Sequence, residues 1–203
     1  MTGHITGMAR WSSNDVRDRL LEAGVQVFSK SGFNGCSVQD ITEAAGVPKG
    51  SFYNHFESKE ALGAAALQHY WSDEACDRLQ ILTQFTLPPL ARLRTYFEQV
   101  AAEMAQIGFT CGCLIGNMSA ELSDHSPIIA TQLAAIFAGW SRKVADCIRE
   151  AQAAGQITSP ADPELLAAFV LNAWEGAILR ARLEKVDRPL RQFIETLFTT
   201  LLH

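Results

Sequence analysis

Apolar residues recur every three to four positions along most of the chain, and the alternation typical of strands is nearly absent. In residues 15–30 the apolar positions fall on one side of a helix: Val16, Leu20, Ala23, Val27 and Phe28. Asn14 is a candidate N-cap for this helix and Gly32 is a candidate stop. The pattern therefore predicts a first helix over residues 15–30.

Two short helices are predicted next. Ser37 and Asp40 resemble a capping box at the start of the first, and Gly46 is placed to end it. Pro48 follows, and proline favours the first turn of a helix, so it opens the second.

A long helix is predicted from Lys59 to about residue 84, with Ser58 as its N-cap. Two short helices joined by a turn that contains glycine, with a longer helix before and after, are typical of a helix-turn-helix unit. In such units the second short helix enters the major groove of DNA.

The stretch PKGSFYNHFESKEAL, residues 48–62, contains that second helix. At about 100° per residue, Phe52 and Phe56 share one side, which indicates core packing. Asn54 lies on the opposite side and carries a group that can read a base edge, while Gly50 lets the backbone approach closely. The neighbouring side chains suit phosphate oxygens: Ser51, Tyr53, His55 and Lys59.

Residues 16–62, and above all DITEAAGVPKGSFYNHFESKEAL, resemble the DNA-binding domain of the tetracycline-repressor (TetR) family of bacterial regulators. The motif consists of Gly-Val, then aromatic-Tyr-x-His-Phe, then Ser-Lys-Glu. The resemblance implies phosphate contacts by Ser37, Ser51, Tyr53, His55 and Lys59. It also implies that bases are read or approached by Gln39, Lys49, Gly50 and Asn54. The alternatives are packing for Tyr53, a structural or solvated histidine for His55, and a surface lysine at a helix start for Lys59.

Helical periodicity continues to the end of the chain. Further helices are predicted over 89–106, 113–123, 127–154, 163–184 and 189–202. The expected fold is all-α, with an N-terminal three-helix helix-turn-helix domain. The resemblance implies that the larger C-terminal part binds a ligand and dimerises. The expected boundaries are a flexible arm at 1–14, the DNA-binding domain at 15–60 and the second domain at 61–203.

The last two predicted helices have broad apolar faces. In helix 163–184 this face contains Leu166, Val170, Ala173, Trp174, Ala177 and Ala181. In helix 189–202 it contains Leu190, Phe193, Ile194, Leu197, Phe198, Leu201 and Leu202. Both faces can simply line the monomer core. In the TetR family, however, the last two helices pair with their two-fold mates, so the resemblance implies a homodimer on a palindromic operator.

Residues 108–124, GFTCGCLIGNMSAELSD, combine glycines, two thiols and an apolar run. The family resemblance implies an inducer pocket in this region and a small-molecule inducer as partner. Candidate lining residues are apolar or aromatic: Phe97, Met104, Phe109, Leu114, Met118, Phe137, Trp140, Phe169 and Trp174. Ordinary core packing is the alternative for each of them.

The motif GCLIGN, residues 112–117, followed by Glu121, is similar to a TetR branch that includes repressors of electrophile- and quinone-detoxification genes. That resemblance implies Cys113 as a responding thiol, with Cys111 as a candidate resolving thiol. A helix N-terminus or a nearby cation would lower the pKa of Cys113. The candidate cations are two arginines, Arg180 and Arg182. Because buried cysteines are usually inert, a non-covalent ligand is the alternative.

Composition limits the other possibilities. A chain of 203 residues with 48% apolar residues suits one large domain or two small ones. The net charge is −5, and residues 1–60 hold six Lys or Arg against seven Asp or Glu, so DNA binding must rest on local geometry. Five cysteines without a CxxC pair argue against a disulfide framework and a metal site. No cofactor is expected.

No apolar run approaches the roughly 18 residues of a membrane-spanning helix, and the first residues lack the centre of a signal peptide. We therefore expect a cytoplasmic protein without a membrane partner. Nucleophile-elbow, zincin and phosphate-loop motifs are absent, so no enzyme is expected.

The expected function is a sequence-specific DNA-binding repressor that a small-molecule inducer releases from a palindromic operator. Control through covalent modification or oxidation of Cys113 is the alternative. Activation of transcription, or a helical interaction module that does not bind DNA, also remain open.

Overall fold

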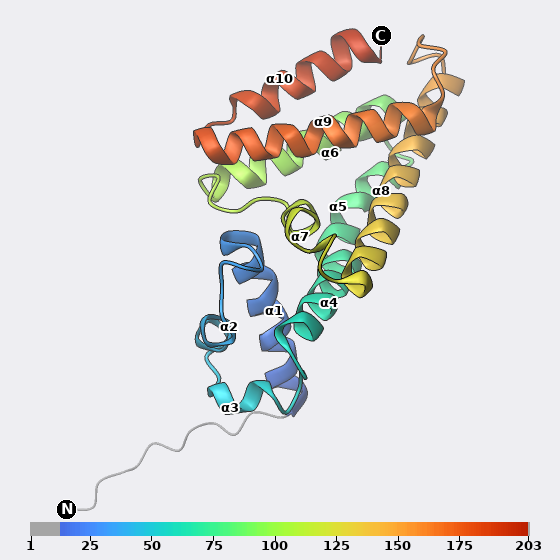
Figure 1. The fold of residues 1–203 in the computed structure, drawn as a ribbon. Coiled ribbons are helices and arrows are strands. Elements are labelled where there is room, and N and C mark those ends of the chain that lie inside the picture. Colours follow the sequence, from blue (N-terminus) through green and yellow to red (C-terminus); the bar gives the residue numbers. More distant parts are fainter. Residues whose placement is uncertain (1–12, 203) are drawn as a thin grey trace, which may run out of the picture.

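A computed structural model describes residues 13–202, and its regular elements within that range are all helical (Figure 1). The N-terminal helices are α1 (Ser13–Ser31), α2 (Val38–Ala45) and α3 (Lys49–Phe52). A long helical segment follows, made of α4 (Lys59–Tyr70), η1 (Trp71–Ala75), α5 (Cys76–Gln80) and η2 (Ile81–Thr83). The remaining helices are α6 (Pro89–Gln106), α7 (Leu114–Leu122), α8 (Pro127–Ala153), α9 (Pro163–Glu184), α10 (Arg188–Thr196) and η3 (Leu197–Leu201). The all-α prediction is confirmed for this part of the chain.

We call α1, α2, α3 and the turn to Phe56 the reading head. Its local signals act as the sequence predicts. The Ser37 hydroxyl accepts a hydrogen bond from the Asp40 amide at 3.2 Å, and the Asp40 carboxylate accepts one from the Ser37 amide at 2.7 Å. This capping box starts α2, and Gly46 ends it in the left-handed conformation with φ +62°.

Two details of the reading head differ from the prediction. Helix α1 begins at Ser13, so Asn14 lies inside its first turn and is not the N-cap. The expected arm at 1–14 lies almost wholly outside the described residues. Helix α3 ends at Phe52, and the chain continues through a turn instead of a further helical turn. Phe52 and Phe56 are nevertheless buried, with ring centroids 5.9 Å apart, so their predicted core role is confirmed.

The helical segment that begins at Lys59 links the reading head to the rest of the molecule. Helix α4 packs against α1 on one side and α8 on the other (Figure 1). The segment reaches Thr83, close to the predicted end, but a π turn spans Trp71–Ala75. A π turn has a wider hydrogen-bonding ring than an α turn and is frequent at functional sites. Apolar periodicity does not reveal such a local change.

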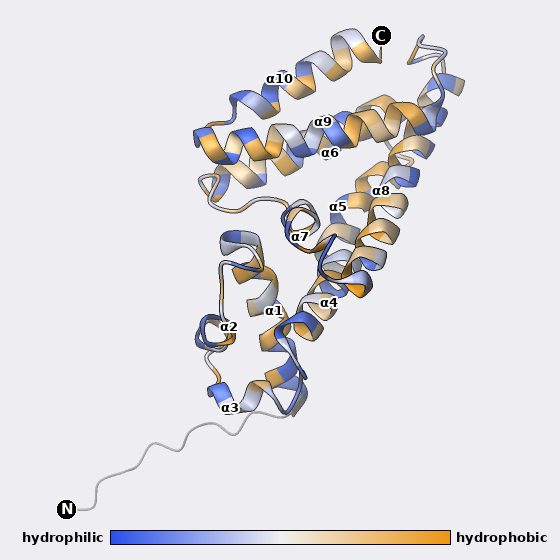
Figure 2. Cartoon of the chain, in the orientation of Figure 1, coloured by the Kyte–Doolittle hydropathy of each residue, from blue (hydrophilic) through white to orange (hydrophobic). Residues whose placement is uncertain are grey.

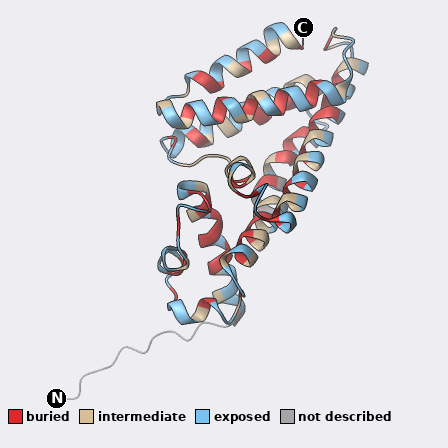
Figure 3. Cartoon of the chain, in the orientation of Figure 1, coloured by how far each residue is buried: buried red, intermediate tan, exposed pale blue. Residues whose placement is uncertain are grey.

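Helices α6, α9 and α10 lie across one end of the molecule, and α8 packs against α6 and α9 (Figure 1). Apolar positions run along α8 and α9 (Figure 2). Buried positions are concentrated on the sides of the helices that face one another (Figure 3). Phe97, Trp174 and Phe193 bring α6, α9 and α10 together, with ring centroids 4.9–5.1 Å apart. This aromatic cluster forms the centre of the C-terminal core.

The apolar faces predicted for dimerisation lie inside the monomer. In α9, the residues Leu166, Val170, Trp174, Ala177 and Ala181 are buried. In α10 and η3, Leu190, Ile194, Leu197 and Leu202 are buried, and Phe193, Phe198 and Leu201 pack against the same core. The fully buried residues therefore belong to the monomer core, as the alternative interpretation has it, whereas Phe193, Phe198 and Leu201 are only partly buried. The opposite side of α9 exposes a different set of apolar residues: Leu165, Phe169, Leu179 and Leu183.

Candidate nucleic-acid interface and ligand cavity

The turn after α3 and the helix itself present polar groups to solvent. Lys49 and Asn54 are exposed, and Tyr53 is 61% exposed although its ring meets that of Phe52 edge-on at 5.2 Å. A Cβ added at Gly50 would meet no atom within 4 Å, so this position is open to a close partner. The predicted division of this segment into a core side and a contact side is thus present in the structure.

Of the four other predicted contact residues in the reading head, two have side-chain hydrogen bonds within it and two are half-buried. The Ser37 hydroxyl donates to the Asp40 carboxylate at 2.7 Å, as part of the capping box. The Gln39 amide donates to Glu43 at 2.9 Å on the exposed side of α2. Ser51 and His55 are half-buried at the edge of the exposed surface.

Lys59 has a role that sequence reasoning did not identify. Its ammonium donates to the carbonyl of Phe33 at 2.8 Å and to the carbonyl of Cys36 at 2.7 Å. It also lies 4.4 Å from the centre of the Phe33 ring. An ammonium has three donors, so one N–H group remains for another acceptor. Lys59 therefore fixes the α1–α2 loop, whatever it contributes to DNA binding.

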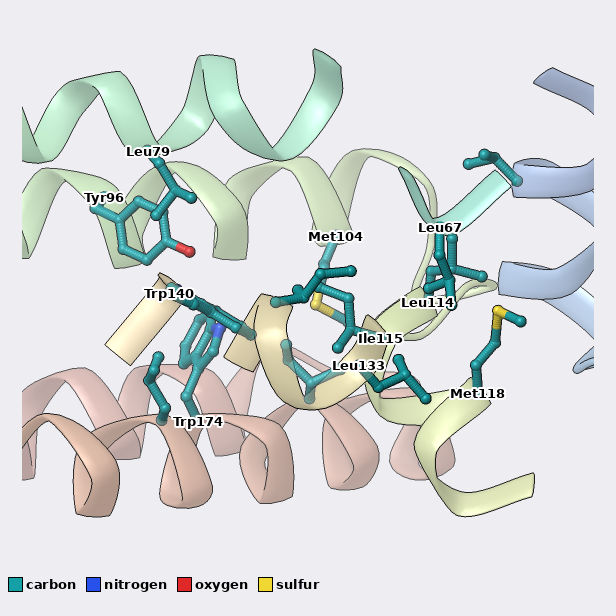
Figure 4. Packing of buried hydrophobic residues seen from close by; sticks show 14 of the residues in the cluster. Leu67, Leu79, Tyr96, Met104, Leu114, Ile115, Met118, Leu133, Trp140 and Trp174 are labelled. Atoms are coloured by element: carbon teal, nitrogen blue, oxygen red, sulfur yellow. The ribbon is translucent and has the colours of Figure 1, made fainter. Parts of the chain in front are cut away.

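A cavity of about 480 Å³ lies between the reading head and the C-terminal helices. Its wall is formed by residues of α1, the segment from α4 to α5, α6, α7, α8, α9 and the loop before α7. Most of the lining is apolar or aromatic, including Val25, Tyr70, Trp71, Leu79, Tyr96, Val100, Met104, Ile115, Trp140, Trp174 and Ile178. Figure 4 shows Tyr96, Trp140 and Trp174 gathered from three different helices. The volume suits a small organic molecule.

Five predicted sensor residues line this cavity: Met104, Cys111, Cys113, Trp140 and Trp174. The other candidates lie outside its lining. Phe97, Leu114 and Met118 are fully packed core residues, Phe109 is buried, and Phe137 stacks on Trp140 at 6.2 Å. Phe169 is 60% exposed on the outer side of α9. Apolar character alone does not distinguish a residue that lines the cavity from one that is packed in the hydrophobic core.

Sequence reasoning missed the contribution of α1 and of the α4–α5 segment to the cavity. The side chains concerned include Val25, Gln26, Ser29, Tyr70, Trp71, Arg78 and Leu79, and Tyr96, Val100 and Glu103 of α6. The adjacent aromatics Tyr70 and Trp71 were a possible signal, because two consecutive large rings cannot both face one helix stripe.

A polar cluster forms one part of the cavity wall. The Arg78 guanidinium donates to the Glu103 carboxylate at 2.8 Å and to the Tyr70 hydroxyl at 3.1 Å. Burial raises the pKa of Tyr96 far above its usual range, so this hydroxyl remains protonated. Arg78 is already balanced by a carboxylate. This wall therefore favours hydrogen bonding with an uncharged ligand over capture of an anion.

Cys113 lies at the N-cap position of α7 and faces the cavity. Burial raises its pKa well above the usual thiol value, and the negative charge of Glu175 raises it further. Burial also raises the pKa of Glu175, while the hydrogen bond from the Cys113 thiol acts in the opposite direction. Burial and Glu175 thus outweigh the expected activation by the helix N-terminus and favour the protonated thiol.

The two candidate cations for Cys113 have other partners. Arg180 is exposed and pairs with Glu184 at 2.6 Å. Arg182 donates to the carbonyl of Lys30 at 2.6 Å and to the side chain of Asn117 at 3.4 Å. Cys36, Cys111, Cys113 and Cys147 are free thiols.

Two known protein-family models match the chain. Residues 89–197, more than half of the chain, match the family model "Tetracyclin repressor-like, C-terminal domain", and residues 20–66 match "Bacterial regulatory proteins, tetR family". The chain belongs to the TetR family. The resemblance seen in the sequence is therefore confirmed, and the protein is a DNA-binding transcriptional regulator of the TetR type.

Individual relatives of this TetR-family chain support the same assignment. It is 46% identical over 187 residues to the HTH-type transcriptional repressor DhaR of Mycobacterium sp. strain GP1, covering 92% of each chain. A TetR regulatory protein from Rhodobacter sphaeroides has a similar structure, with a TM-score of 0.86, 37% identity, and coverage of 90% of this chain and 97% of the other. The reduced form of Escherichia coli NemR gives a TM-score of 0.81 and 28% identity, covering 90% and 95%.

No helix among residues 13–202 has both the length and the apolar character needed to cross a membrane.

Proposed function

We propose that this protein is a repressor that binds a palindromic operator as a homodimer and leaves it when a small, largely apolar molecule fills the cavity. The observation that carries the proposal is the composition of the cavity wall. Val25, Gln26 and Ser29 belong to α1 of the reading head, whereas Trp140 and Trp174 belong to the C-terminal helices. A ligand between these groups contacts both parts of the molecule, so its binding energy can favour one arrangement of them.

The proposed operator contacts follow the exposed side of the reading head. Phosphate contacts are assigned to Ser37, Ser51, Tyr53, His55 and the remaining N–H group of Lys59. Base contacts or close approach are assigned to Gln39, Lys49, Gly50 and Asn54. The support is the exposure of Ser37, Gln39, Lys49, Tyr53 and Asn54, the position of the half-buried residues Ser51, His55 and Lys59 beside them, and the open space at Gly50. We assign the chain no enzymatic activity, and as a DNA-binding regulator it would act in the cytoplasm.

The proposed dimer interface is the outer side of α9. Leu165, Phe169, Leu179 and Leu183 recur along this side, where Leu183 is 80% exposed. A helix that is apolar on two sides needs a second partner for the side that its own monomer leaves uncovered. The outer side of α10 and η3, by contrast, carries Arg191, Gln192, Glu195 and Thr199, and contributes a polar rim.

The alternative function is repression relieved by chemical modification of Cys113. Its support is the position of this thiol in the cavity wall and the relationship to NemR, of which a reduced form is described. Protonation of the thiol makes Cys113 slow to react by itself. Reversible ligand binding is therefore the first candidate.

Fluorescence anisotropy of a labelled duplex tests the proposal. The duplex comes from the region upstream of the protein's own gene, or from a genomic fragment selection if that region is not bound. We expect salt-dependent binding, and competition by the specific duplex at concentrations at which random DNA does not compete. A library of small apolar compounds is then screened for quenching of tryptophan fluorescence. Compounds that quench should also release the duplex in both wild type and Cys113→Ser.

Two results would contradict the proposal. Failure to bind any genomic fragment would remove the DNA-binding assignment. Compounds that occupy the cavity without changing the affinity for the duplex would remove the inducer role. If thiol-reactive compounds release the duplex from the wild type but not from Cys113→Ser, the result would favour control through modification of Cys113.

A further inference from the structure

The end of α1 is held by side chains that come from the C-terminal helices. The Glu121 carboxylate of α7 accepts hydrogen bonds from two successive amides, those of Phe33 at 3.0 Å and Asn34 at 2.6 Å. Gly32 precedes them with φ +79°, and a Cβ at this position would lie 2.3 Å from the Glu121 carboxylate. Gly32 therefore provides both the left-handed turn and the space for the carboxylate.

The carbonyl groups at the end of α1 are satisfied in the same way. The Asn117 amide of α7 donates to the carbonyl of Ser29 at 3.2 Å, and Arg182 of α9 donates to that of Lys30 at 2.6 Å. The backbone amide of Gly112 also donates to Ser29, at 3.3 Å. The last carbonyls of a helix have no partner within it, so these contacts act as its C-cap. We call this set of contacts the α1 clamp: Gly112, Asn117, Glu121 and Arg182.

The α1 clamp meets the reading head at the loop that leads into α2. Glu121 binds the amide of Phe33, and Lys59 binds the carbonyl of the same residue. The loop then reaches Ser37, the N-cap of α2. Helices α2 and α3 pack against each other, so the orientation of α3 follows that of this loop.

The other end of α7 is at the cavity. Cys113 is the N-cap residue of α7, and both Cys113 and Ile115 line the cavity. A helix of nine residues is about 13 Å long and moves as a stiff element. A displacement at its cavity end must therefore change the position of Glu121 at the other end.

We propose that Glu121 is a positioning residue for operator binding, which fixes the reading head to α7 and transmits the state of the cavity to it. This inference rests on the proposed function, because it assumes that filling the cavity weakens operator binding. The alternative is that Glu121 only stabilises the fold. The positioning role and the purely stabilising role predict different effects on the coupling between the cavity and the DNA-binding surface. This coupling depends on both sites together and cannot be measured at either site alone.

The test is a double-mutant cycle read out as operator affinity. Val100→Trp fills the cavity with a side chain of the protein itself, so no inducer has to be known. Glu121→Ala removes the carboxylate, Glu121→Gln retains one acceptor oxygen, and Asp124→Asn removes a charge from a nearby exposed position as a control. Thermal unfolding of every variant is recorded in parallel.

We expect Glu121→Ala to lower operator affinity about tenfold, with Glu121→Gln intermediate and Asp124→Asn unchanged. The slope of log affinity against log salt should stay at the wild-type value, because Glu121 touches no phosphate. Val100→Trp should weaken operator binding about tenfold or more in the wild-type background and less than about threefold in Glu121→Ala.

Wild-type operator affinity in both Glu121 variants would overturn the positioning role. An equal loss from Val100→Trp in both backgrounds would overturn the transmission role and leave cavity control of DNA binding intact. If Val100→Trp has no effect in either background although it folds, cavity control itself fails, and transmission fails with it. Glu121→Gln keeps the test decisive if Glu121→Ala does not fold.

Discussion

Single residues of the same type have different roles in the reading head. Lys49 is exposed at the start of α3, whereas the Lys59 ammonium binds the carbonyls of Phe33 and Cys36. Both lysines match a DNA-contact pattern in the sequence. The difference arises from a loop more than twenty residues before Lys59, which no local pattern describes.

Replacing Lys59 by alanine should therefore lower stability as well as DNA affinity. We expect the free energy of unfolding to fall by about 1–3 kcal/mol, since two carbonyls lose a charged donor. Urea denaturation followed by circular dichroism measures this. The matched change Lys49→Ala should weaken DNA binding and leave stability unchanged. Equal stability of the two variants would contradict the structural role of Lys59.

Asn54 is exposed on the side of the reading head that faces away from the core. We expect Asn54→Ala to reduce the preference for operator over random DNA by about 1–3 kcal/mol, because an amide can pair with a base edge. Anisotropy titrations with both duplexes measure the preference. Equal losses on the two duplexes would instead indicate a phosphate contact.

Glu175 raises the pKa of the Cys113 thiol through its charge and its hydrogen bond. Glu175→Gln removes that charge, so the pKa of Cys113 should fall and a larger fraction should be thiolate at pH 8. The rate of alkylation by iodoacetamide at Cys113, followed by peptide mass spectrometry, should rise and its pH midpoint should move downward. Cys36, reported by the same digest, is the internal control. An unchanged midpoint for Cys113 would show that burial alone sets its pKa.

At the scale of elements, the helix starts and ends that depend on neighbouring residues could be predicted from the sequence. The capping box at Ser37 and the helix end at Gly46 depend on contacts within a few residues and lie where the sequence predicts them, and α6, α8 and α9 begin at the predicted residues 89, 127 and 163. Phe52 and Phe56 are buried as predicted, although Phe56 lies beyond the end of α3. The cavity wall could not be predicted as a set, because it needs the relative placement of seven separate segments.

For helix α9, the sequence does not distinguish the side that packs in the monomer core from the side available to a partner. Apolar residues occur on both of its sides, so periodicity does not indicate which side the monomer buries. The structure buries the side with Trp174 and exposes the side with Phe169 and Leu183. A choice between two apolar stripes depends on where α8 and α10 pack, which is tertiary information.

The exposed stripe of α9 leads to a direct test of the dimer. Leu179→Glu should weaken association by about a hundredfold or more, because it places a charge in an apolar interface. Light scattering coupled to size-exclusion chromatography should report half the molar mass at micromolar concentration. Thr199→Glu, an exposed position of η3 in the polar rim, should keep the mass of the parent, because a charge at a solvent-accessible rim costs little. An unchanged mass for Leu179→Glu would show that this stripe does not form the interface.

At the scale of the whole molecule, the two reading heads of the proposed dimer must match two half-sites on one face of DNA. The half-sites of helix-turn-helix dimers are about one turn, or 34–36 Å, apart or a multiple of it. Inserting five base pairs between the half-sites of the selected operator rotates one of them by about half a turn. We expect at least a hundredfold loss of affinity in gel-shift titrations, while a ten-base-pair insertion costs less. Equal losses of affinity from the five- and ten-base-pair insertions would indicate that binding does not depend on the two half-sites lying on the same face of the DNA.

The two sides of α9 connect the cavity with the proposed dimer interface. Trp174 and Ile178 line the cavity on its inner side, while Phe169 and Leu179 are exposed on its outer side. In the proposed dimer, a molecule that shifts this helix would change how well two copies fit together, and pairing would in turn change the cavity. The number of copies per cell then becomes a second input beside the inducer. Strains with higher gene dosage should need more inducer for the same response.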